Sequence, residues 1–161
     1  MGSALVNRTV DAAQQRLAAD ETSLRSASPL KPGTLGGRLR MYGVPTDLPV
    51  DAFVGREFNQ ICLGRFQLQF HASGTGSISV EGRWELRDDA QTLVDGEQDH
   101  AERGTFRLHP IIDVPITRVS IDPPKAFSIF FENCWTLTIF DDSPQYEAFS
   151  IHLDGQTSVY I

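Results

Sequence analysis

Two short segments in the C-terminal two thirds of the chain concentrate acidic side chains that could recognise a charged ligand. One is the polar stretch 88–103 and the other is the acidic pair beside Pro144. Clustered carboxylates attract basic proteins and repel nucleic-acid phosphate. We therefore predict partner-binding residues at Asp88, Asp89, Asp95, Glu97, Asp99, Asp141 and Asp142.

The residues that could bind a metal do not form a recognised motif. The histidines are His71, His100, His109 and His152. None stands in a two-residue or HExxH spacing, although side chains from different strands could still converge. Residues 95–99 resemble the start of a calcium loop, but His100 replaces its glycine and Phe106 its final glutamate. We predict no metal and no cofactor.

Motifs of nucleotide binding and nucleophilic catalysis are also missing. The glycines at 33–37 and 74–76 are not followed by Lys-Ser or Lys-Thr, and no GxSxG elbow occurs. Cys62 or Cys134 could pair with a histidine, but nothing in the sequence orders such a dyad. No pattern therefore requires an enzyme.

One arrangement keeps an enzyme hypothesis open. Glu81 and Glu85 share a strand face, but four residues of strand separate them by about 13 Å, too far for a glycosidase pair. The remaining candidates are His71, Glu81 and His152, if strands bring them together.

The cysteines and the apolar runs indicate the compartment. Two cysteines without CxxC spacing are typical of free thiols in a reducing environment, with a Cys62–Cys134 disulfide as the alternative. No run of eighteen apolar residues and no secretory signal is visible. We expect a cytoplasmic protein that binds neither membrane nor nucleic acid.

The distribution of charge and the positions of proline and glycine divide the chain into two parts. The net charge is −7, with six basic against four acidic residues in 1–50 and eight against seventeen in 51–161. Apolar residues at helical spacing predict a helix over 7–25. Prolines and glycines predict an arm or linker over 26–50, and an antiparallel β domain follows over 51–161.

Alternating apolar and polar residues predict about nine short strands in that domain. The expected strands are 57–63, 66–71, 77–87, 105–109, 116–122, 126–131, 135–141, 146–153 and 156–161. Tight turns are expected at Gly64-Arg65 and Asp154-Gly155, and Phe66 should face inward with Leu68 and Phe70. The predicted fold is mainly β, an antiparallel meander curled into a sandwich or open barrel, with one N-terminal helix.

Three segments resemble a family of small uncharacterised bacterial β proteins. The segments are FENCWTLTI (131–139), YEAFSI (146–151) and ISVEGRW (78–84), and Cys134 stands where such hairpins usually have glycine. The resemblance covers roughly residues 55–161. It implies a domain of unknown function similar to the acidic immunity proteins that occur beside bacterial toxin genes, with no catalytic residue.

These observations lead to three hypotheses about function. The first is a non-enzymatic binding protein, of immunity type, that neutralises a basic toxin or effector, with self-association through residues 1–50. The second is a lipocalin-like binder of a small apolar ligand. It requires a void among Phe66, Phe70, Trp84, Phe127, Phe131 and Phe149. The third is the enzyme with a cross-strand histidine and carboxylate site.

Overall fold

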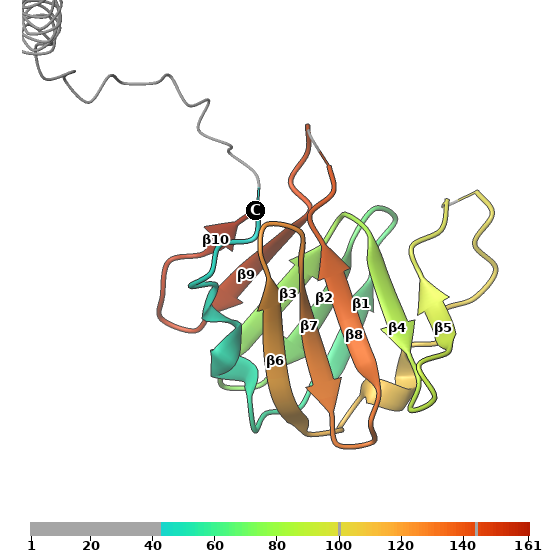
Figure 1. Ribbon diagram of the computed structural model, residues 1–161, viewed down its shortest axis with the longest axis horizontal. Helices are drawn as coiled ribbons and strands as arrows, with labels where there is room; N and C mark the ends of the chain where they lie inside the picture. The colour runs from blue at the N-terminus through green and yellow to red at the C-terminus, as the bar shows by residue number, and fades with distance from the viewer. Residues whose placement is uncertain (1–42, 100, 144) are drawn as a thin grey trace, which may run out of the picture. The chain divides into compact units, whose positions relative to one another are not determined.

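The computed structural model describes residues 43–99, 101–143 and 145–161, which form two five-stranded antiparallel sheets packed face to face (Figure 1). This arrangement is a sandwich and contains no closed barrel. The helix predicted over 7–25 lies outside the described residues. Within the described residues, no helix has the length and apolar character needed to cross a lipid bilayer.

The first sheet has the strand order β1-β2-β3-β9-β10, and the second has the order β5-β4-β8-β7-β6. The first contains β1 (Gln60–Leu63), β2 (Leu68–Ala72), β3 (Gly76–Val80), β9 (Phe149–Leu153) and β10 (Val159–Tyr160). The second contains β4 (Trp84–Arg87), β5 (Leu93–Gly96), β6 (Ile116–Asp122), β7 (Ala126–Phe131) and β8 (Thr136–Phe140). Short 3-10 helices are η1 (Pro49–Phe53) and η2 (His109–Ile111).

The predicted meander is wrong in its connections, because two strand pairs join distant parts of the chain. The pairs are β3 with β9 and β4 with β8. The single strand predicted over 77–87 is divided between the two sheets. The N–H groups of Glu81 and Gly82 both donate to the Ala148 carbonyl, at 2.9 and 2.8 Å, and the chain crosses between the sheets there.

The alternation of apolar and polar residues continues across this crossing, and its apolar residues form part of the core. Ile78 and Val80 of β3 and Trp84 and Leu86 of β4 are all buried. A Cβ at position 82 would lie 3.0 Å from the Ala148 Cβ, which is tighter than most such contacts, so glycine allows the two segments to approach this closely without a shift of Ala148.

Aromatic rings fill the space between the sheets. The Phe58 ring lies 5.3 Å from that of Phe70 and 6.1 Å from that of Phe131, while Phe127 and Phe149 are 5.0 Å apart. Contacts of this kind add to the free energy gained by burying apolar surface. The core also includes Val44, Leu48 and Val50, which stand within the predicted arm.

Several local predictions are corrected by the structure. Residues 105–109 form no strand, and β5 occupies the stretch expected to be a polar connection. The turn after β1 has four residues, closed by the Gly64 N–H donating to the Gln67 carbonyl at 2.8 Å, since Leu63 pairs with Leu68. In the last hairpin Ile151 pairs with Val159, so its loop is also longer than predicted.

Candidate functional site

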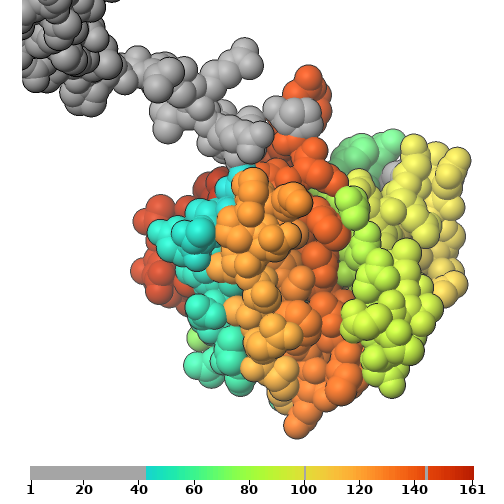
Figure 2. Space-filling view, viewed as in Figure 1, coloured from blue at the N-terminus to red at the C-terminus, as the bar shows by residue number. Residues whose placement is uncertain are grey.

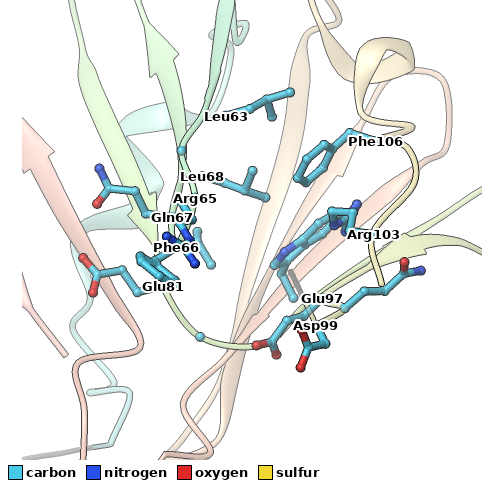
Figure 3. Close-up of a pocket in the computed structure, with 15 residues that line it drawn as sticks. Leu63, Arg65, Phe66, Gln67, Leu68, Glu81, Glu97, Asp99, Arg103 and Phe106 are labelled. Carbon is cyan, nitrogen blue, oxygen red and sulfur yellow. The ribbon is translucent and has the colours of Figure 1, made fainter. Parts of the chain in front are cut away.

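An open cleft of about 620 Å³ lies at one end of the sandwich (Figure 3). It is bounded by the β1–β2 turn, by the crossing from β3 to β4 and by the segment after β5. These three segments are distant in the sequence, and the packing of the two sheets brings them together. Clefts of this volume are large enough for a small molecule or a few side chains of a partner protein.

Exposed apolar side chains form the wall on the side of the first sheet. Phe66 is 73% exposed and Leu63 is 54% exposed, and the Arg65 guanidinium lies 4.9 Å from the centre of the Phe66 ring. Phe66 faces outward because it stands in the four-residue turn and not in β2. The predicted inward orientation of Phe66 is therefore wrong.

Arg103 and two aromatic rings form the opposite wall. The Arg103 guanidinium lies 3.7 Å from the centre of the Phe106 ring and 5.4 Å from that of Trp84. It also donates to the carbonyls of Gly96 and Thr105. These contacts hold the side chain in one position, and Figure 3 shows it next to Phe106 across the cleft from Phe66.

The buried partner of Arg103 is Asp95. Its Oδ1 lies 3.3 Å from the guanidinium and accepts the Gly96 N–H at 2.9 Å, while its Oδ2 accepts the Arg107 N–H at 2.6 Å. Asp95 is only 6% exposed. Asp95 was predicted to contact a partner, and the structure shows this carboxylate enclosed within the protein, where it holds the segment after β5 in place.

Three carboxylates line the cleft. Glu97 and Asp99 follow β5, and Glu81 stands at the crossing between β3 and β4 (Figure 3). Partial burial and then the nearby Asp142 carboxylate raise the pKa of Glu97, against an opposing effect of Arg83. Burial and the Asp142 carboxylate thus both disfavour the ionised form of Glu97, and a cation placed beside Glu97 would favour that form.

Asp142 joins this acidic group from the loop between β8 and β9, the loop that projects above the second sheet in Figures 1 and 2. It lies 3.2 Å from Arg83, whose other nitrogen is 2.8 Å from Glu85. The neighbouring Asp141 is half-buried. Of the predicted partner-binding residues, the structure thus places Glu97 and Asp99 in the cleft and Asp142 near Glu97.

Asp88 and Asp89 lie elsewhere, in the turn at the other end of the β4–β5 hairpin. Asp88 accepts the Thr92 N–H at 2.8 Å and Asp89 accepts the Ala90 N–H at 3.0 Å. The four residues of β5 separate this turn from Glu97 by about 13 Å. Their local hydrogen bonds are those of turn-forming aspartates.

The enzyme candidates do not converge. His71 and His152 lie on the outward face of the first sheet, on the two strands that flank Ser77 of β3. Glu81 lies in the cleft. His109 is exposed in η2. Among the described residues, no three His, Cys, Asp or Glu side chains are grouped so that they could hold a metal ion. The cysteines are free, with Cys62 half-buried and Cys134 exposed.

An apolar-ligand binder of the lipocalin-like kind requires a void among the aromatic side chains of the interior, and those side chains are packed. Phe70, Trp84, Phe127, Phe131 and Phe149 are at most 4% exposed and belong to one packed cluster. Their rings contact other core side chains, while Phe66 lies outside the core. Leu63 and Phe66 of the cleft wall, and not the space between the sheets, therefore offer accessible apolar surface to a ligand.

No family model, no curated protein and no solved structure matches the chain. The geometry of the cleft therefore carries the functional argument.

Proposed function

We propose that the protein is a non-enzymatic binding protein whose cleft holds a segment of a basic protein partner. The observation that carries this proposal is the exposed Phe66 and Leu63 on one side of an open cleft that also contains Glu97 and Asp99. An apolar surface beside carboxylates matches a partner segment that combines an apolar side chain with lysine or arginine.

The charges of the cleft favour a cation. Its lining contains the guanidinium groups of Arg65 and Arg103 and the carboxylates of Glu81, Glu97 and Asp99. Arg103 is already paired with Asp95, which does not line the cleft. Among the lining side chains, the positive charge of Arg65 is therefore outnumbered by three carboxylates. A lysine or arginine of the partner would be attracted here.

The aromatic walls favour the same kind of partner. Phe66 is 73% exposed beside the Arg65 guanidinium, and a guanidinium or ammonium of a partner over an aromatic ring gains about 0.5–2 kcal/mol. Exposed aromatic side chains in a concave site are also typical anchors of protein interfaces. A partner that covers Phe66 would remove this apolar surface from water.

In its specific form the proposal is an immunity-type protein that neutralises a basic toxin or effector. Residues 51–161 carry seventeen acidic against eight basic side chains, so long-range attraction would speed association with such a partner. Attraction of this origin weakens as salt screens the charges.

Capture from a cell lysate with three matched baits tests the proposal. The baits are the unaltered chain, a cleft variant with Glu97→Gln and Asp99→Asn, and a control with Asp88→Asn and Asp89→Asn. The cleft variant and the control lose the same charge, but only one loses it at the cleft. A basic protein held by the unaltered chain and the control, and lost by the cleft variant, supports the proposal. Equal retention by all three baits would contradict it.

A further inference from the structure

The first sheet contains no charged residue in any of its strands. None of the residues of β1, β2, β3, β9 and β10 is Asp, Glu, Lys or Arg, although such residues make up 22% of the chain. Protein surfaces normally carry charges throughout, and their depletion is typical of the central part of an interface.

The pairing registers show which side chains form the outward face of this sheet. One row across the strands contains Gln60, His71, Ser77 and His152. The next row contains Cys62, Gln69, Ser79, Ser150 and Tyr160, and the two serines of this row are buried between their larger neighbours. The intervening row, with Phe70 and Ile78, points into the core. The strands of the outward face are therefore polar and uncharged, and Asp154, in the turn after β9, lines a pocket on this face together with His71, Ser77 and His152.

The other outward face of the sandwich is different. The second sheet, whose outward face is turned to the viewer in Figure 2, carries Glu85 and Arg87 on β4 and Arg118 and Asp122 on β6. Glu85 and Arg87 are joined by an ion pair of 2.7 Å. Charge is thus present on one face of the sandwich strands and absent from the other.

This difference determines which partner each surface suits. A basic protein gains nothing from an uncharged face. A second copy of this acidic chain is repelled by most of the surface, but the strands of this face bring no like charges together. Its hydroxyl, amide and imidazole groups each combine donor and acceptor capacity, so identical groups can hydrogen-bond to one another across a two-fold axis.

We propose that two copies of the chain pair through the outward face of the first sheet, about a two-fold axis. Ser77 lies at the centre of its row, between His71 and His152. His152 already makes hydrogen bonds to hydroxyl groups of the kind that this face presents. Its Nε2 lies 3.3 Å from the Ser150 hydroxyl, and its Nδ1 contacts the Ser158 hydroxyl.

The size of the face predicts a weak dimer. The five strands contain 21 residues in all, and with a rise of about 3.3 Å and a strand spacing of about 4.8 Å they cover roughly 330 Å². Stable complexes bury about 800 Å² on each partner, so the pairing should be reversible and depend on concentration. The two strands at the edges of the sheet, β1 and β10, also lack the charges and prolines that usually prevent association at edges.

Sedimentation equilibrium of the full chain over a wide concentration range tests this proposal. We expect the mass to rise from 17.9 kDa toward twice that value. Ser77→Lys places like charges on both sides of the interface and should weaken the dimer at least about tenfold, as expected for apposed like charges. Ser120→Lys on β6 is the matched control, because it adds the same charge to the outward face of the second sheet.

Circular dichroism verifies that each variant is folded. Gln60→Lys, at an exposed position of the same row, replaces Ser77→Lys if that variant does not fold. A chain that stays monomeric at the highest concentration would overturn the proposal. A dimer that Ser77→Lys and Ser120→Lys leave equally stable would also overturn it, and would favour self-association through residues 1–50.

Discussion

The guanidinium of Arg103 lies 3.3 Å from the Asp95 carboxylate, and these side chains are only 9% and 4% exposed. The pair joins β5 to the segment that forms one wall of the cleft. Asp95 also accepts two backbone N–H groups, so most of its hydrogen-bonding capacity is used within the protein. The shape of the cleft therefore depends on this pair.

Removing one member of the pair should strongly destabilise the fold. Arg103→Ala leaves the Asp95 carboxylate buried without its cation, and losses of about 3–5 kcal/mol are typical of such changes. We expect a loss of this order in the free energy of unfolding, measured by urea denaturation. Arg83→Ala is the control, since Arg83 and Asp142 are 45% and 49% exposed and pairs of this kind contribute about 1 kcal/mol or less. Equal losses would refute the role of Arg103.

Two phenylalanines should respond in opposite ways to truncation. Phe149→Ala creates a cavity in the core beside Phe127 and should cost about 3–5 kcal/mol of stability. Phe66→Ala changes an exposed side chain and should alter stability by about 0.5 kcal/mol or less. If the cleft binds a partner, Phe66→Ala should nevertheless weaken binding, and calorimetry with the captured partner would measure this loss. Unchanged affinity would exclude Phe66 from the interface.

Cys134 offers a stabilising substitution. It adopts a φ of 65°, which places the turn between β7 and β8 in a conformation that favours glycine. Cys134→Gly should raise the unfolding free energy by up to about 1 kcal/mol, whereas Cys134→Ala, which keeps a Cβ, should not. Thermal unfolding of both variants compares them directly. A gain with alanine equal to that with glycine would attribute the effect to loss of the thiol.

Glu97 should make the protein less stable as the pH rises through the acidic range. Its pKa in the folded chain is raised above the ordinary glutamate value of 4.5 by burial and by Asp142. Because the folded state binds this proton more tightly than the unfolded state, the associated stability is fully present below 4.5. That stability is lost as pH rises through the raised pKa. Glu97→Gln should remove this loss in urea unfolding measured across that range.

Glu85 should show the opposite dependence. Hydrogen bonds from Arg83, opposed by partial burial and assisted by Arg87, lower the pKa of Glu85 below 4.5. Its contribution is therefore present above the unfolded-state pKa and is lost as pH falls through the lowered value. In the acidic range, Glu85→Gln should make the free energy of unfolding rise less steeply with pH, whereas Glu97→Gln should make it rise more steeply. Parallel curves for the two variants would contradict both assignments.

The Glu97 carboxylate also makes partner binding depend on pH. A cationic side chain beside Glu97 favours its ionised form, so binding should release a proton from that group. Affinity for a basic partner should therefore rise with pH through the raised pKa and become less dependent on pH in Glu97→Gln. Calorimetry in buffers of different ionisation enthalpy would detect the proton. Binding without this difference between the two chains would exclude Glu97 from contact with the cation.

Alternating patterns predicted the interior of the protein well. Ile78, Val80, Trp84 and Leu86 were expected on one face and are all buried, because alternation records burial along a strand. The same pattern could not reveal that the chain leaves one sheet for the other at Gly82. That change depends on the close approach of Ala148, which is distant in sequence.

The candidate site was predicted only in part, for two reasons. Glu97 and Asp99 line the cleft and Asp142 lies near Glu97, but a cluster in the sequence does not distinguish exposed carboxylates from one enclosed by arginine, as Asp95 is. Phe66 was assigned to a strand because it alternates with Leu68 and Phe70. The turn is two residues longer than a tight hairpin, and that difference places Phe66 outside.

The order in which the strands follow one another has a consequence for synthesis. The second sheet is one uninterrupted stretch, Trp84 to Phe140, while the first is completed only when β9 pairs with β3. The second sheet is therefore synthesised before β9, the strand that pairs with β3 in the facing sheet. Until β9 is made, the facing sheet consists of β1, β2 and β3 alone, so part of the apolar inner surface of the second sheet stays exposed to water or is shielded by a chaperone. A message truncated before Phe149 should yield an aggregating product.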